Sequence, residues 1–181
     1  MSFHELPPEV LEILANYSAS PRLIAHLMVV HDVAIRLIEH LAVSWPLLAY
    51  DRHSILIGAA IHDIGKVVYP DERTGPGTRH EEIGPQLLLE SGFPETATRF
   101  ARTHARWKQE TSVQLENLLV AFADTIWKGK RDEVLEQAIA TQIASQCQEE
   151  IWAVYIKLDD IAGELAQDAH ERILWQGKHS L

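Results

Sequence analysis

Apolar residues recur at intervals of three and four along most of this 181-residue chain, which is the spacing of one face of an α-helix. In the stretch after Pro21, the residues at these intervals are Leu23, Leu27, Val30, Ala34, Leu37 and Leu41. The sequence shows neither the apolar and polar alternation of a strand nor an internal repeat or low-complexity tract. The pattern therefore predicts an all-α fold, a helical bundle.

Capping residues and helix breakers predict where the helices begin and end. The expected starts are Pro7 with Pro8, Ser20 with Pro21, Asp51, Thr78, Pro94, about Thr111, and Asp132. The first helix is expected to end at about Tyr17 and the third at about Gly65, and Gly92 and Gly129 are further stops. A loop rich in Pro, Gly and charge is expected around residues 67–79. After Asp132 we expect helix to about Trp175, with one break near QCQEE (residues 146–150).

The length and the 46% hydrophobic content are sufficient for one domain with its own core, so we expect a single domain over residues 1–181. Cys147 is the only cysteine, which excludes a disulfide framework and any zinc site with several thiolates. The start of the chain has no basic segment followed by an apolar stretch, and nowhere do about 18 apolar residues run together. We therefore expect a cytoplasmic protein that makes no membrane contact.

The formal net charge is −10, because 26 acidic residues outnumber 16 lysines and arginines. This balance opposes nonspecific binding to the phosphates of long nucleic acids. It does not oppose a small phosphorylated ligand, because two bound divalent cations would make one site strongly positive.

The stretch AAIHDIGK (residues 59–66) places His62 and Asp63 side by side at the end of an apolar helix. Both side chains bind protons and metals, and a buried run has no structural need for such a pair. The preceding Gly58, Ala59 and Ala60 are small enough to let another helix approach closely. We interpret the pair as the anchor of a metal centre, provided that the rest of the chain supplies partners.

Two interior positions offer such partners. His26 lies on the apolar stripe of the second expected helix, and alone it is either a core histidine satisfied by a carbonyl or a ligand. Asp124 follows an uninterrupted apolar run, where a carboxylate needs a compensating charge. That charge is either a metal ion or Lys128, one turn further on.

His80 and His104 lie near helix ends, where a single histidine is tolerated at the surface because of the helix dipole. Together with the pair and its interior partners they make four imidazoles and two carboxylates from five expected helices. A site for two first-row divalent metals requires this composition, since a carboxylate can bridge the ions and imidazoles can fill the outer positions.

The series His26, His62 with Asp63, His80, His104 and Asp124 resembles the HD superfamily of metal-dependent phosphohydrolases over about residues 20–130. AAIHDIGK, RHEEIG, ARTHA and AFADTIW follow one another in the order and spacing of the binuclear branch. The chain is most similar to bacterial HD hydrolases that split dinucleoside polyphosphates. Its core is also similar to cyclic-dinucleotide phosphodiesterases, although their GYP signature is missing. The resemblance implies an HD-domain helical bundle with additional C-terminal helices at about 132–175.

The resemblance also implies how the six residues divide. One divalent metal would be held by His26, His62, Asp63 and Asp124, and Asp63 would bridge to a second one held by His80 and His104. Imidazole and carboxylate accept iron, manganese, zinc, cobalt or nickel, and magnesium is a further possibility. The ions would share a water, lower its pKa and direct it at phosphorus, which makes Asp63 a catalytic residue.

Four basic residues near the expected ligands are candidates for substrate binding. Lys66, one turn beyond Asp63, either binds or protonates a phosphate oxygen, as the resemblance also suggests, or is a solvated lysine at a helix end. The other three either clamp further phosphates or lie on the surface; they are Arg79, Arg102 and Arg106.

We therefore expect an enzyme, a metal-dependent phosphohydrolase that cleaves a phosphate ester or anhydride of a small nucleotide-like substrate. Trp107 and Trp127 either stack on a base or belong to the core. Two alternatives stay open: a diiron HD-type oxygenase with the same ligands, and a nucleotide-sensing module that does not catalyse. The helices after Asp132 either cover the core or face another subunit of a homodimer.

Overall fold

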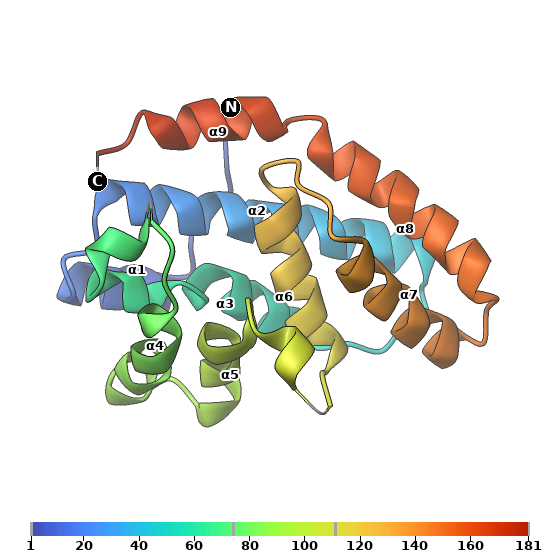
Figure 1. Cartoon of the computed structure of the whole chain (residues 1–181), viewed down its shortest axis with the longest axis horizontal. Helices are drawn as coiled ribbons and strands as arrows, with labels where there is room; N and C mark the ends of the chain where they lie inside the picture. The colour runs from blue at the N-terminus through green and yellow to red at the C-terminus, as the bar shows by residue number, and fades with distance from the viewer. Residues whose placement is uncertain (1, 74, 111, 181) are drawn as a thin grey trace.

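The computed structural model describes residues 2–73, 75–110 and 112–180, and within these residues it contains helices and no strand (Figure 1). The all-α prediction is confirmed. The α-helices are α1 (Pro8–Asn16), α2 (Pro21–Ser44), α3 (Arg52–Ile61), α4 (Arg79–Glu90), α5 (Glu95–Thr103), α6 (Leu115–Ile126), α7 (Glu133–Cys147), α8 (Ile151–Ala166) and α9 (Ala169–Gly177). Three short 3-10 helices are η1 (Ile64–Val67), η2 (Pro70–Arg73) and η3 (Trp107–Gln109).

Side-chain caps explain three of the helix starts. The hydroxyl of Ser20 accepts a hydrogen bond from the backbone N–H of Leu23 at the start of α2. The Asp51 carboxylate accepts hydrogen bonds from the N–H and the hydroxyl of Ser54 at 3.1 and 2.7 Å. Asp132 caps α7 in the same way. These caps satisfy backbone donors that have no partner within a helix, so the predicted starts at these positions are confirmed.

Two predicted stops are also confirmed, and one is wrong. Gly92 and Gly129 follow α4 and α6 with φ of +84° and +75°, the left-handed region that glycine adopts without strain. By contrast, α3 ends at Ile61 instead of about Gly65, and the chain continues as a turn and then as η1. Gly65 packs directly against the backbone of α4, which the chain can approach only after it has left the axis of α3.

Two further boundaries differ from the prediction. The helix expected from about Thr111 begins at Leu115, and Thr111 itself lies outside the described residues. The last third of the chain breaks twice instead of once. The first break is the expected one, at Gln148 with φ of +55°. The second break lies between Ala166 and α9. Across it, Arg172 of α9 donates a hydrogen bond to the carbonyl of Leu165 in the last turn of α8. This second turn carries α9 back along α2, a tertiary contact that no local pattern predicts.

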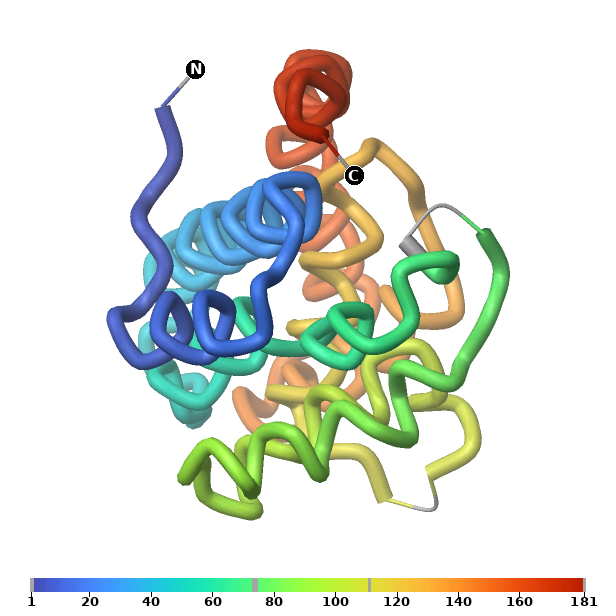
Figure 2. Tube along the Cα trace, turned by 90° about the vertical axis from the view of Figure 1, so that its left-hand side faces the viewer, coloured from blue at the N-terminus to red at the C-terminus, as the bar shows by residue number. Residues whose placement is uncertain are grey.

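The buried apolar residues form two clusters that meet along α2. The larger cluster joins α2, α3 and α6 to α7 and α8, and the smaller one joins α1 and the first turns of α2 to η1, α4 and α5. Figure 2 shows α2 nearly end on, with α9 beside it. The first half of α2 and the end of α3 belong to the junction of the clusters, so polar side chains there are surrounded by protein. None of the described helices combines the length and the apolar character needed to cross a membrane.

Candidate metal centre

Asp63 lies at the junction of α3, η1 and α4, and its two carboxylate oxygens face different imidazoles. Oδ2 lies 3.1 Å from Nε2 of His26 and 3.6 Å from Nε2 of His62. Oδ1 lies 3.3 Å from Nε2 of His80 and 3.4 Å from Nε2 of His104. The end of α3 at Ile61 makes this possible, because the turn that follows points Asp63 toward α4 and α5.

Asp124, in the last turn of α6, completes the arrangement. Its Oδ1 lies 3.4 Å from Nε2 of His26 and 3.5 Å from Nε2 of His62, and the two imidazole nitrogens are 3.3 Å apart. Among the described residues Asp124 makes no ion pair with Lys128, so the alternative of a simple salt bridge is not what the structure shows. The structure thus brings all six expected side chains together. We call His26, His62, Asp124 and Asp63 Oδ2 the first ligand set, and His80, His104 and Asp63 Oδ1 the second.

The spacing of these atoms fits divalent cations. Metal bonds of about 2.0–2.2 Å place neighbouring ligand atoms roughly 2.8–3.6 Å apart, and the measured separations are 3.1–3.6 Å. Within the part of the chain that the structure describes, Asp63 Oδ1 and His80 Nε2 are buried without a hydrogen bond. A buried polar atom in that state needs compensation, which a cation between the two atoms would supply.

The far sides of three imidazoles are fixed by hydrogen bonds. Nδ1 of His62 lies 2.9 Å from the carbonyl of Ala59, and Nδ1 of His104 lies 3.2 Å from the carbonyl of Phe100. Nδ1 of His80 lies 2.7 Å from a carboxylate oxygen of Glu72. A proton on Nδ1 satisfies each contact and leaves the Nε2 lone pair facing Asp63, as metal ligation requires.

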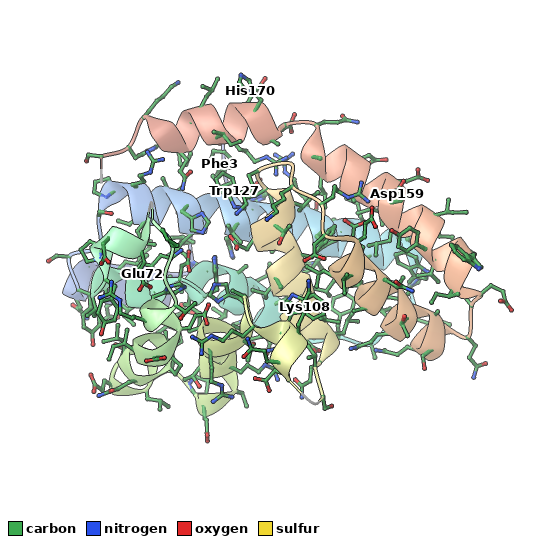
Figure 3. All side chains as sticks on the ribbon, in the orientation of Figure 1. Phe3, Glu72, Lys108, Trp127, Asp159 and His170 are labelled. Atoms are coloured by element: carbon green, nitrogen blue, oxygen red, sulfur yellow. The ribbon has the colours of Figure 1, made fainter. Side chains whose placement is uncertain are left out.

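Sequence reasoning missed two buried acids. One is Glu81, which offers an oxygen within 4.8 Å of ligand atoms of His80 and His104. The other is Glu72. Its side chain is buried, one oxygen accepts hydrogen bonds from the backbone N–H and Nε of Arg79, and the other accepts them from the backbone N–H and Nδ1 of His80. Burial raises the pKa of Glu72, but the hydrogen bonds from His80 and Arg79 prevail and lower it to about 2. Figure 3 labels Glu72 near α4. Nothing in the charged loop distinguishes this acid from its neighbours, so the sequence offers no signal for it.

The carboxylates of the centre stay ionised at neutral pH. Burial alone would raise the pKa of Asp63, but His62 and Lys66 hold it well below its usual range. Burial likewise opposes ionisation of Asp124, but hydrogen bonds from His26 and His62 hold its pKa well below the usual range. The pKa of His62 is lowered, mainly by burial, which favours the neutral imidazole that binds metals.

A cavity of about 200 Å³ opens over the first ligand set. His26, Asp63 and Asp124 line it together with Arg22, Leu23, Lys66, Trp127, Lys128 and Gln176. Nζ of Lys66 lies 2.5 Å from Oδ2 of Asp63, so this predicted substrate residue does lie in the centre. A larger cavity of about 380 Å³ lies between α1, α3 and α5 and contains none of the six ligands.

The three arginines expected near the substrate lie outside this cavity. Arg79 is bound to Glu72 and Asp71 and stacks on a tyrosine ring, and Arg106 is paired with the buried Glu81. Arg102 is exposed on α5. Contact of these arginines with a substrate therefore stays a prediction.

The two candidate tryptophans differ in burial. Trp107 is half-buried in η3. Trp127, labelled in Figure 3, is buried and lines the cavity. Its ring makes an edge contact with His26 at 5.4 Å between ring centres. Trp127 therefore belongs to the hydrophobic core and also forms an apolar wall of the cavity.

Comparison with known proteins identifies the family and a distant relative of the chain. The family model of the HD domain matches residues 23–129. A tRNA (cytidine(56)-2'-O)-methyltransferase of Thermoplasma volcanium is 24% identical over 143 residues, which cover 71% of this chain and 38% of that protein. The chain thus spans well under half the length of this relative. No solved structure matches the chain significantly.

Proposed function

The chain belongs to the HD-domain family, whose members are mostly metal-dependent hydrolases, and from this premise we propose that it is a phosphohydrolase of the binuclear branch. Its substrate would be a phosphate ester or anhydride of a small nucleotide-like compound. The observation that supports this most strongly is the Asp63 carboxylate, whose two oxygens face separate pairs of imidazoles. A bridging carboxylate between two metal positions requires this arrangement.

In this proposal the first ligand set holds one divalent cation and the second ligand set holds another. Bound cations supply Lewis acidity, which makes water nucleophilic near neutral pH and neutralises phosphate oxygens. Asp63 fixes the two sets relative to each other, because it belongs to both. Glu72 holds the His80 ring in the orientation that the second set needs.

Lys66 is placed to act on the phosphate. Its ammonium group lies 2.5 Å from Asp63 Oδ2 and its side chain is partly exposed to the cavity. From this position it can donate a hydrogen bond to a phosphate oxygen, or a proton to the leaving oxygen. Leu23 and Trp127 form apolar walls beside it.

The size of the cavity supports a phosphate end as its occupant. At about 200 Å³ it is smaller than the range of roughly 300–1,000 Å³ that is usual for pockets that enclose a whole ligand. A phosphate group would fit over the first ligand set, and the remainder of a nucleotide would extend toward solvent.

The test begins with protein purified without added metal, in which bound metals per chain are measured. The protein is then reconstituted with manganese, iron, zinc, cobalt, nickel or magnesium and assayed on a panel of phosphorylated compounds. We expect two ions per chain in the wild type, one in His104→Ala, and loss of hydrolysis in Asp63→Asn. His170→Ala is the matched control, because His170 is exposed on α9 (labelled in Figure 3). A metal-loaded wild type that hydrolyses no compound of the panel would refute the proposal.

The same experiment separates the two alternatives. Turnover that depends on oxygen, together with a mixed-valent iron signal in spin resonance, would identify an oxygenase. Turnover with manganese in the absence of oxygen would identify hydrolysis. If the wild type were inactive but bound a nucleotide, and Asp63→Ala bound it equally tightly, the protein would be a sensor.

A further inference from the structure

The cavity over the first ligand set is bordered by cationic side chains from three separate segments. Arg22 comes from the first turn of α2, Lys66 from η1, and Lys128 from the residues after α6. Of these, Lys66 is paired with Asp63. Neither Arg22 nor Lys128 makes an ion pair with any acid among residues 2–73, 75–110 and 112–180. In a chain of formal charge −10, two cations without an acidic partner at the border of one cavity indicate a place for an anion.

The C-terminal helix supplies the remaining polar side chain, Gln176. Two polar contacts beside the ends of α9 join this segment to α2, with which α9 is in contact. The N–H of Arg22 donates a hydrogen bond of 2.9 Å to the carbonyl of Ser180, after α9, and Arg36 pairs with Asp168, before α9, at 3.3 Å. The position of Gln176 at the cavity therefore follows from the packing of α9. Both Arg22 and Gln176 lie outside residues 23–129, the part of the chain that the HD-domain model matches.

We infer that Arg22, Lys128 and Gln176 form a subsite for a second anionic group of the substrate, next to the phosphate that is cleaved. The inference rests on the proposed function, in which the reacting phosphate lies over the first ligand set beside Lys66. Arg22 offers a planar set of donors and Lys128 a point charge, and the amide of Gln176 adds a neutral hydrogen bond. The second group is an oxyanion, either a phosphate or a carboxylate. Substrates with only one anionic group leave the subsite empty.

Binding of phosphonates, which the enzyme cannot hydrolyse, tests this directly. Isothermal titration calorimetry on the metal-loaded protein would compare methylphosphonate with two compounds that carry a second anion, phosphonoacetate and methylenediphosphonate. We expect the wild type to bind at least one of these two about tenfold more tightly than methylphosphonate, because the second group gains charge-assisted hydrogen bonds. The tighter of the two tells whether the subsite takes a carboxylate or a phosphate.

Variants assign the gain to individual residues. Arg22→Gln and Lys128→Gln should each remove most of the roughly tenfold gain of the preferred compound, and Gln176→Ala about half of it, while binding of methylphosphonate changes less than about twofold. Lys130→Gln is the matched control, because Lys130 is an exposed lysine two residues away that does not line the cavity. Melting curves verify that each variant is folded.

Several results would overturn the inference. Equal weakening of all three compounds, or an equal effect of Lys130→Gln, would mean that the cations act only through the general field of the protein. If Arg22→Gln and Lys128→Gln both bound the preferred compound as tightly as the wild type, the subsite would be excluded. Binding of methylphosphonate that depends on metal would still agree with the proposed function in that case. A metal-loaded protein that binds none of the three compounds would overturn the subsite, whereas the hydrolysis assay on phosphorylated compounds decides the proposed function.

Discussion

Replacing Gly65 by alanine should disconnect the second ligand set from Asp63. A Cβ atom at this position would lie 2.0 Å from the carbonyl oxygen of His80, whereas ordinary contacts begin at 3.4 Å. The obstacle is backbone, so no change of rotamer relieves it, and η1 and α4 must separate by more than 1 Å. Metal ligands tolerate shifts of only about 0.2 Å, so His80 can no longer share an ion with Asp63.

The stability of this variant should fall as well. Overpacking in a core costs about 1–3 kcal/mol, and a backbone clash belongs at the upper end of that range. For a chain of this length about 3 kcal/mol corresponds to a decrease of roughly 6–12 °C in the melting temperature. Gly163→Ala is the matched control, because an added Cβ there meets nothing within 4 Å on an exposed face of α8. That change should raise stability by roughly 0.5–1 kcal/mol.

The assay is metal content per chain by elemental analysis after reconstitution, combined with thermal unfolding. We expect Gly65→Ala to retain an ion at the first ligand set and to lose the one at the second, and Gly163→Ala to retain both. If Gly65→Ala held two ions per chain and melted with the wild type, close packing of η1 on α4 would not be what positions His80.

Three further changes probe separate parts of the structure. Glu72→Gln removes the charge behind His80 and should weaken the second ion roughly 10- to 100-fold in a chelator competition; unchanged affinity would contradict the role given to this carboxylate. Asp51→Ala removes the cap of α3 and should lower the unfolding free energy in urea by about 1 kcal/mol at neutral pH. Hydrogen bonds from Ser54 lower the pKa of Asp51. The ionised cap therefore stabilises the folded state fully at pH values above the ordinary carboxyl pKa, and this stabilisation is lost as the pH falls through the lowered pKa. The difference between wild type and variant should therefore shrink in acid, and a constant difference would argue against an ionised cap. Phe122→Ala empties a fully buried position on α6 and should cost about 3–5 kcal/mol in the same urea assay, unlike a change at an exposed position.

The caps and stops that the sequence predicts lie within a few residues of the features that they control. Ser20, Asp51 and Asp132 each accept a hydrogen bond from the first turn that follows, so their effect is local. The end of α3 and the second break of the C-terminal helices escape this reasoning. Both depend on contacts with distant segments, such as that of Gly65 with the backbone of His80.

For the candidate centre, residue type and burial pattern indicated four of the six expected ligands, and the family resemblance supported the choice of His80 and His104. His62 and Asp63 are adjacent at the end of an apolar run, and Asp124 interrupts another, so each lies where a polar group needs a partner. The structure places Nε2 of His62 within 3.6 Å of both carboxylates, while the binding of metal by these side chains stays a prediction. The three candidate arginines show the limit of this approach, since nearness in sequence to a ligand did not place them at the cavity.

The sequence by itself determined the helical class and four interior side chains suited to a cation, because helix periodicity and the cost of burying charge act on each segment separately. The choice of His80 and His104 also used the order and spacing of the motifs that resemble the HD superfamily. Only the tertiary structure decided which segments surround the centre. Packing between helices that are far apart in the chain places Glu72 behind His80. The same packing brings three further residues around the cavity: Arg22, Lys128 and Gln176. No spacing in the sequence encodes such contacts directly, since they depend on how the faces of several helices fit together at once.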